Sequence, residues 1–238
     1  MPCPLPLRAL TRFRRTLPGN SPAIFYERCS GHGLDLDQAS AAPALLTLWD
    51  PAFVGPCDRQ SIFTSAIMVK NYSAVEHLRD GSTIEISALQ PDDRDDMLAA
   101  VGRTSTKSLQ RRFFVPKRGF SEKEVSFFMN IDFSNHVALV AHVDEDGDSV
   151  IAGGGRYIIV RPGQAELAFV VVDAYQGKGI ATILMRHLLV IAREAGLKEL
   201  TAEVLPENAA MLKVFSKFGF RAGSGSDPQV RHLTLQLA

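Results

Sequence analysis

The sequence predicts a mixed α/β domain built around a largely antiparallel sheet. Three apolar runs, at residues 137–143, 150–160 and 165–172, are separated only by short turns, as in consecutive antiparallel strands. The third run leads through a glycine-rich turn into an amphipathic helix at residues 180–195, so the chain crosses over before the next strand. A further strand at 199–205 and a helix at 208–217 complete the pattern.

Composition excludes several classes of protein. Of the 238 residues, 46% are hydrophobic, which is enough to bury a sizeable core. The formal net charge is zero, so bulk electrostatics gives no support for nucleic-acid binding. No apolar run approaches the length of a membrane span. We therefore expect a soluble, cytoplasmic protein with neither nucleic acid nor membrane as a partner, and the sequence leaves its oligomeric state open.

Two different compositions meet near residue 68. All three cysteines (Cys3, Cys29 and Cys57) precede it, whereas the first lysine is Lys70. Residues 1–67 lack sustained helix or strand periodicity. They could be a targeting peptide, a small module, or an over-extended reading frame whose start is Met68. We expect a poorly structured extension over 1–67 and one folded domain over 68–238.

Shorter elements are expected between residues 71 and 129. Residues 71–79 predict a short helix, and the alternation over 82–88 is typical of an edge strand. Pro91 and the acids after it begin a helix that reaches about Val101. Ser121 and Glu124 form a capping-box pattern for another helix.

The acidic turn over residues 144–148 (Asp-Glu-Asp-Gly-Asp) invites a calcium interpretation. It is too short for an EF-hand loop and lies between two strands, so a solvated hairpin tip is favoured. The six histidines show no metal-ligand spacing. We therefore expect no metal site.

The glycine turn at residues 176–181 (Gln-Gly-Lys-Gly-Ile-Ala) has the form of a phosphate cradle, because backbone N–H groups can converge on an anion at the start of a helix. It is not a P-loop, since Gly177-Lys178 is followed by Gly179 where a Ser or Thr is needed. A Rossmann fingerprint would need a third glycine at Thr182. Both nucleotide motifs are therefore disfavoured.

The pattern Gln-x-x-Gly-x-Ala resembles the pyrophosphate-binding motif of the GNAT family of N-acetyltransferases, which hold acetyl-CoA. The strand at 199–205, the helix opening at Asn208 and the pair Gly219-Phe220 match the family's order, so the resemblance covers roughly residues 82–238. It implies a mixed, mostly antiparallel sheet with splayed central strands and helices on both faces. The implied acetyl-CoA contacts are Val170, Val171, Val172, Gln176, Gly177, Lys178, Gly179, Ile180, Ala181, Thr182, Asn208 and Met211.

Amine acetylation needs a base, because at neutral pH only roughly one lysine in a few thousand is unprotonated. Glu166 is the only carboxylate in an apolar run, and partial burial would raise its pKa toward the useful range. From position alone, an ion pair with an arginine such as Arg156 is an equal alternative. The family resemblance favours Glu166 as the base.

Two further requirements concern the thioester. Backbone N–H groups at residues 170–172 are expected to stabilise the oxyanion, because the splayed strand of the family leaves them unpaired. Many family members protonate the departing thiolate with a tyrosine, but Phe215 stands at that position. Solvent, Ser216 or another residue could replace it. Residues 58–238 contain no cysteine, so we expect direct transfer without an acetyl-cysteine intermediate.

The acceptor is suggested by a finer resemblance. Residues 105–114, 165–171 and 204–211 are similar to the catalytic domain of bacterial protein lysine acetyltransferases that modify acyl-CoA synthetases. Residues 105–114 would be an acceptor wall, or simply a basic amphipathic helix that packs Phe113 and Phe114. Acetylation of a small amine and a catalytically silent acyl-CoA sensor are the alternatives. An acidic, concave pocket would favour the small amine.

Overall fold

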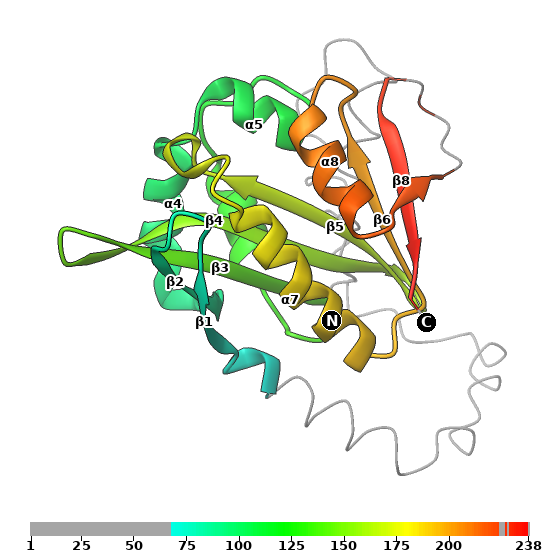
Figure 1. The fold of residues 1–238 in the computed structure, drawn as a ribbon, viewed down its shortest axis with the longest axis horizontal. Coiled ribbons are helices and arrows are strands. Elements are labelled where there is room, and N and C mark those ends of the chain that lie inside the picture. The colour runs from blue at the N-terminus through cyan, green and yellow to red at the C-terminus, as the bar shows by residue number, and fades with distance from the viewer. Residues whose placement is uncertain (1–67, 224–226, 228, 238) are drawn as a thin grey trace, which may run out of the picture.

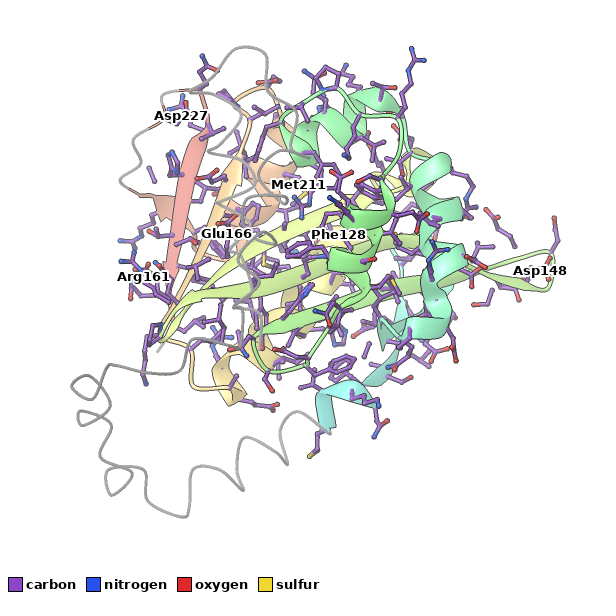
Figure 2. All side chains as sticks on the ribbon, turned by 180° about the vertical axis from the view of Figure 1, so that it is seen from behind. Phe128, Asp148, Arg161, Glu166, Met211 and Asp227 are labelled. Atoms are coloured by element: carbon purple, nitrogen blue, oxygen red, sulfur yellow. The ribbon has the colours of Figure 1, made fainter. Side chains whose placement is uncertain are left out.

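The computed structural model describes residues 68–223, 227 and 229–237. Eight strands form one sheet in the order β1-β2-β3-β4-β5-β6-β8-β7. Figure 1 shows helices in front of this sheet, and Figure 2, seen from the opposite side, shows further helices on its other face. The predicted extension over residues 1–67 lies outside the described residues.

The first hairpin differs from the prediction. Residues 71–79 were expected to form a helix, but β1 (Ser73–His77) is a strand that pairs with β2 (Thr83–Ala88) over five residues. Pairing with β2 provides hydrogen-bond partners for the backbone N–H and C=O groups of β1, which in a helix would have bonded to one another. Gly81 forms the turn between the two strands with φ +84°. Consequently β1 forms the edge, and β2 lies between β1 and β3 instead of forming the edge itself.

The three central strands form the predicted antiparallel meander. β3 (His136–Glu145), β4 (Asp148–Arg161) and β5 (Gln164–Val171) pair in sequence order. Figure 2 shows Asp148 at the tip of the long β3–β4 hairpin, far from Glu166. The acidic turn thus projects away from the centre of the molecule, as expected of a solvated hairpin tip.

Two helices cover the face of the sheet that is in front in Figure 1. The amphipathic helix α7 (Ile180–Glu194) packs on β3, β4 and β5, and its apolar side includes Leu184, Met185 and Leu188, all fully buried. The helix α8 (Ala209–Lys217) lies beside it, in front of β6 (Glu199–Val204). This crossover makes β6 parallel to β5.

The other face carries the earlier helices. The short 3₁₀ turn η2 (Pro91–Asp93) leads into α4 (Arg94–Gly102), which packs on β4, and α6 (Glu122–Met129) begins at Ser121 with the predicted capping box. Between them, α5 (Thr106–Phe113) contacts β5 at the upper end of the sheet in Figure 1.

The C-terminal segment adds two strands that the sequence analysis did not identify. β8 (Arg231–Gln236) pairs with β6 over six residues, and the two-residue β7 (Arg221–Ala222) pairs with β8. In the part of the chain that the structure describes, no helix has the length and apolar character to cross a bilayer.

Candidate active site

The sheet opens between β5 and β6. These two strands are paired only at three positions, from Gln164–Glu199 to Glu166–Thr201, and then diverge, as Figure 1 shows. A cavity of about 450 Å³ lies at this opening and is lined from β5, β6, α5, α8 and the glycine turn. The splayed central strands that the family resemblance implied are therefore present.

The glycine turn forms one end of this cavity. It follows the 3₁₀ turn η3 (Asp173–Tyr175). Gly177 has φ +82° and Gly179 has φ +106°, a region that residues with a Cβ rarely adopt. Helix α7 begins directly after Gly179 with no side-chain cap. The N–H of Thr182 donates to Gly179 O at 2.9 Å, so the N–H groups that precede it in the first turn are the ones available to an anion at the positive end of the helix dipole. These features fit a pyrophosphate group.

Most of the predicted site residues line the cavity. Two do not. Lys178 turns away and forms an ion pair with Asp80, Nζ to Oδ2 3.1 Å, and Val172 is buried in the core. The residues that the structure brings together are Glu166, Val170, Val171, Gln176, Gly177, Gly179, Ile180, Ala181, Thr182, Asn208 and Met211.

The valine backbone differs in part from the expectation. The N–H of Val172 donates to Ala152 O at 2.9 Å, so it is paired with β4 and not open to the cleft. Because N–H groups alternate along a strand, Val170 directs its N–H toward β4 as well. Val171 faces the other way, since its carbonyl accepts from Gln176 Nε2 at 3.0 Å. Of the three valines, Val171 alone presents its N–H to the opening.

Gln176 braces the turn. Its side-chain amide donates to Ser108 Oγ and to Val171 O, each at 3.0 Å, and its backbone N–H donates to Asp173 O at 3.2 Å. These bonds tie the glycine turn to β5 and to α5. The side chain of Gln176 thus supports the turn's conformation in addition to lining the cavity.

Glu166 lies in the middle of the sheet, where Figure 2 labels it, and its exposure is 4%. Arg112 of α5 lines the same cavity and attracts it electrostatically. Burial lowers the pKa of Arg112 to about 10, and the charge of Glu166 opposes this shift. Arg156, the partner that the sequence suggested, donates to Phe128 O at 3.1 Å and to His136 Nε2 at 3.0 Å. A carboxylate in this position can accept a proton inside the cavity.

Near α8, two sequence-based expectations are confirmed: Asn208 is the N-cap of the helix, and Phe215 is a core residue. Asn208 caps α8, accepting from the N–H of Met211 at 3.3 Å, and also lines the cavity. Phe215 is 2% exposed and packs edge-on against Phe169 and Phe220, with ring centroids 6.0 and 4.9 Å apart. Ser216 is exposed and is not among the cavity-lining residues, so it is poorly placed to protonate a thiolate there.

Two cationic residues of the site were missed. Arg79 reaches the glycine turn from the β1–β2 hairpin, and its Nε lies 3.8 Å from the point where a Cβ on Gly179 would be. It fell in a segment predicted as helix, so nothing local indicated a phosphate contact. Arg112 belongs to the basic stretch that was singled out as a possible acceptor wall, but its position opposite Glu166 depends on how α5 meets β5.

Within residues 68–223, 227 and 229–237, no cluster of His, Cys, Asp or Glu is arranged to hold a metal ion.

Comparison with known proteins identifies the family. A profile of the Acetyltransferase (GNAT) family matches residues 104–220. An acetyltransferase of Pseudomonas aeruginosa is 33% identical over 147 residues, which cover 61% of this chain and 79% of that protein. The chain belongs to the GNAT acetyltransferase family. It is therefore an N-acetyltransferase by family, and the matched region includes the glycine turn at residues 176–181.

Further relatives agree with this assignment. The GNAT domain of S. lividans PAT has a TM-score of 0.64 and 33% identity, over 69% of this chain and 97% of that domain. Acetyltransferase Pat of Mycolicibacterium smegmatis is 30% identical over 60% of this chain, but the match spans only 42% of that longer protein. A Salmonella typhimurium acetyltransferase solved with acetyl-CoA shares the fold, with a TM-score of 0.53 and 19% identity.

Proposed function

We propose that this protein transfers the acetyl group of acetyl-CoA directly to a lysine side chain of another protein, with Glu166 as the general base. The observation that carries the proposal is the position of Glu166. It is buried on β5 in the same cavity that the uncapped start of α7 closes at its other end. A base and an anion-binding turn that share one cavity match the two ends of an acetyl-CoA-dependent reaction.

The residues divide the chemistry as follows. The N–H groups after Gly179 would hold the pyrophosphate of acetyl-CoA, and the N–H of Val171 would face the thioester carbonyl. The lysine nitrogen forms a bond to the acetyl carbon while the carbon–sulfur bond breaks. Glu166 accepts the proton that the amine loses, directly or through a water molecule. Solvent protonates the CoA thiolate, because Phe215 has no proton to give.

The lysine acceptor is supported by the resemblance to bacterial protein lysine acetyltransferases and by the charge of the cavity. An acidic pocket would favour a polycationic small amine, but the lining of this cavity is not predominantly acidic. Its charged lining comprises Arg79, Arg111, Arg112, Glu166, Glu203, Lys213 and Lys217. With cations in the majority, a polyamine, which carries several positive charges, would be repelled more strongly than a single lysine side chain.

The test compares wild type with Glu166→Gln, using labelled acetyl-CoA and a cell lysate, and locates acetyl-lysine by mass spectrometry. We expect the variant to bind acetyl-CoA normally and to lose transfer by about 10²- to 10⁴-fold, the usual contribution of a general base. Glu194→Gln, on the exposed side of α7, is the matched control and should retain wild-type transfer.

Three results would count against the proposal. Transfer that survives in Glu166→Gln would remove the base assignment. Transfer to spermidine but to no protein would favour the small-amine alternative. Binding of acetyl-CoA by wild type without transfer to any amine would favour the silent sensor.

A further inference from the structure

Asp173 joins the turn before the phosphate motif to the start of helix α5. One carboxylate oxygen accepts the N–H of Ser105 at 2.7 Å. The other accepts the hydroxyls of Ser105 at 2.8 Å and Ser108 at 2.9 Å. Ser105 is also the N-cap of α5, accepting from the N–H of Ser108 at 3.2 Å. A single side chain of η3 is therefore bonded to the first turn of α5 at three points.

The first residue of the glycine turn, Gln176, bonds to the same junction. The hydroxyl of Ser108 accepts a hydrogen bond from Gln176 Nε2 at 3.0 Å and donates to Asp173. Gln176 also donates to Val171 O, so β5, the glycine turn and α5 share one chain of hydrogen bonds. In a network of this kind the hydrogen bonds polarise and strengthen one another, so its members hold one another in place.

A second side chain of η3 connects to the end of α4. Tyr175 donates its hydroxyl to Glu145, which also accepts from Arg103 Nη1 at 3.0 Å. Arg103, the C-cap residue of α4, donates its Nη2 to Ile151 O at 3.0 Å. The turn η3 is thus bonded to the start of α5 through Asp173, and to the end of α4 through Tyr175, Glu145 and Arg103.

Asp173 is charged in this arrangement. Partial burial alone would raise its pKa, but the hydrogen bonds from Ser105 and Ser108 lower it below its ordinary value. Hydrogen bonds to an ionised acceptor are stronger than those between neutral groups. The network is therefore intact at neutral pH.

Helix α5 carries this connection into the active site. Arg111, Arg112 and Phe114 line the cavity together with Glu166. We propose that Asp173 is a positioning residue that makes the phosphate turn and α5 one hydrogen-bonded unit, so that occupation of the turn by CoA also holds the wall facing Glu166. The inference rests on the proposed function, because it requires that CoA binds at this turn.

Hydrogen exchange with CoA as the probe tests the coupling. Each protein is studied at about 100 times its own Kd for CoA, determined by calorimetry, because binding at that ratio can suppress an opening by about 100-fold. In wild type we expect CoA to slow exchange both in residues 177–182 and in α5. In Asp173→Ala, residues 177–182 should still be slowed, whereas the slowing in α5 should be at least about tenfold smaller.

Two more variants separate the network from simple helix capping. Ser108→Ala breaks the link between Gln176 and Asp173 but keeps the N-cap of α5, and should also reduce the slowing in α5. It carries the test alone if Asp173→Ala does not fold. Ser121→Ala removes the N-cap serine of α6, which is outside the network, and should leave the slowing in α5 at the wild-type level.

Equal slowing of α5 in wild type, Asp173→Ala and Ser108→Ala would overturn the inference, because direct contact with CoA would then explain it. That result would leave the proposed function intact. Failure of wild type to bind CoA would instead overturn the proposed function and this inference together.

Discussion

Arg79 is a single cation that the fold brings to the phosphate turn from the distant β1–β2 hairpin. We expect Arg79→Ala to raise the KM for acetyl-CoA about tenfold with little change in kcat, because a charge-assisted hydrogen bond to phosphate contributes about 1.5–3 kcal/mol before solvent screening. Steady-state kinetics with varied acetyl-CoA measures this. Arg94→Ala, which removes an exposed ion pair with Glu122, is the control. A fall in kcat at constant KM would contradict the assignment.

The roles of some site residues could be predicted because they depend only on neighbouring residues in the sequence. The glycines at 177 and 179 are required by local backbone geometry, and Glu166 stood out as an acid in an apolar run. Arg79 and Arg112 could not be assigned, because each acquires its role only from a partner that the fold supplies. The pairing of Val172 with Ala152 was equally hidden, since it depends on which edge of β5 faces β4.

At the scale of the element, β4 carries three successive glycines, and the absence of side chains there allows β5 and α7 to pack closely against it. A Cβ on Gly155 would lie 2.6 Å from the ring of Phe169 and 3.0 Å from Leu188 Cδ1, whereas on Gly154 its nearest neighbour would be Leu139 O at 3.4 Å. We expect Gly155→Ala to cost about 1–3 kcal/mol through overpacking, and Gly154→Ala to cost clearly less. Urea unfolding measures both free energies. Equal losses would refute the close-packing explanation.

Whether a segment forms a helix or a strand was predicted correctly from its hydrophobic periodicity in the longer segments. The helices at 180–194 and 209–217 and the central meander agree with the sequence within a residue or two at most ends. β1 was wrongly predicted as a helix, because a five-residue segment has too few positions to establish a period and its pairing with β2 decided the outcome. β7 and β8 were not identified in the sequence, and the structure shows them paired with each other and, for β8, with β6.

At the scale of the whole molecule, a histidine buried at the start of β3 makes the fold sensitive to acid. Burial and the neighbouring Arg156 lower the pKa of His136 from 6.5 to about 3. Its Nε2 accepts from Arg156 and its Nδ1 lies 3.2 Å from Asn130 O, an arrangement that suits the neutral imidazole. Asp132 partly opposes the shift, and the pKa of His187 is lowered as well.

The sign of the effect follows from proton binding. Between about pH 6.5 and pH 3 the unfolded chain protonates this histidine while the folded chain does not, so stability falls as pH falls through this window. From pH 7 to pH 5 the loss from His136 amounts to about 2 kcal/mol, at about 1.4 kcal/mol per pH unit below 6.5. Urea unfolding of wild type and His136→Gln at both pH values measures it. The variant cannot titrate there, so it should lose about 2 kcal/mol less than wild type, and an equal loss would show that His136 is protonated in the folded protein.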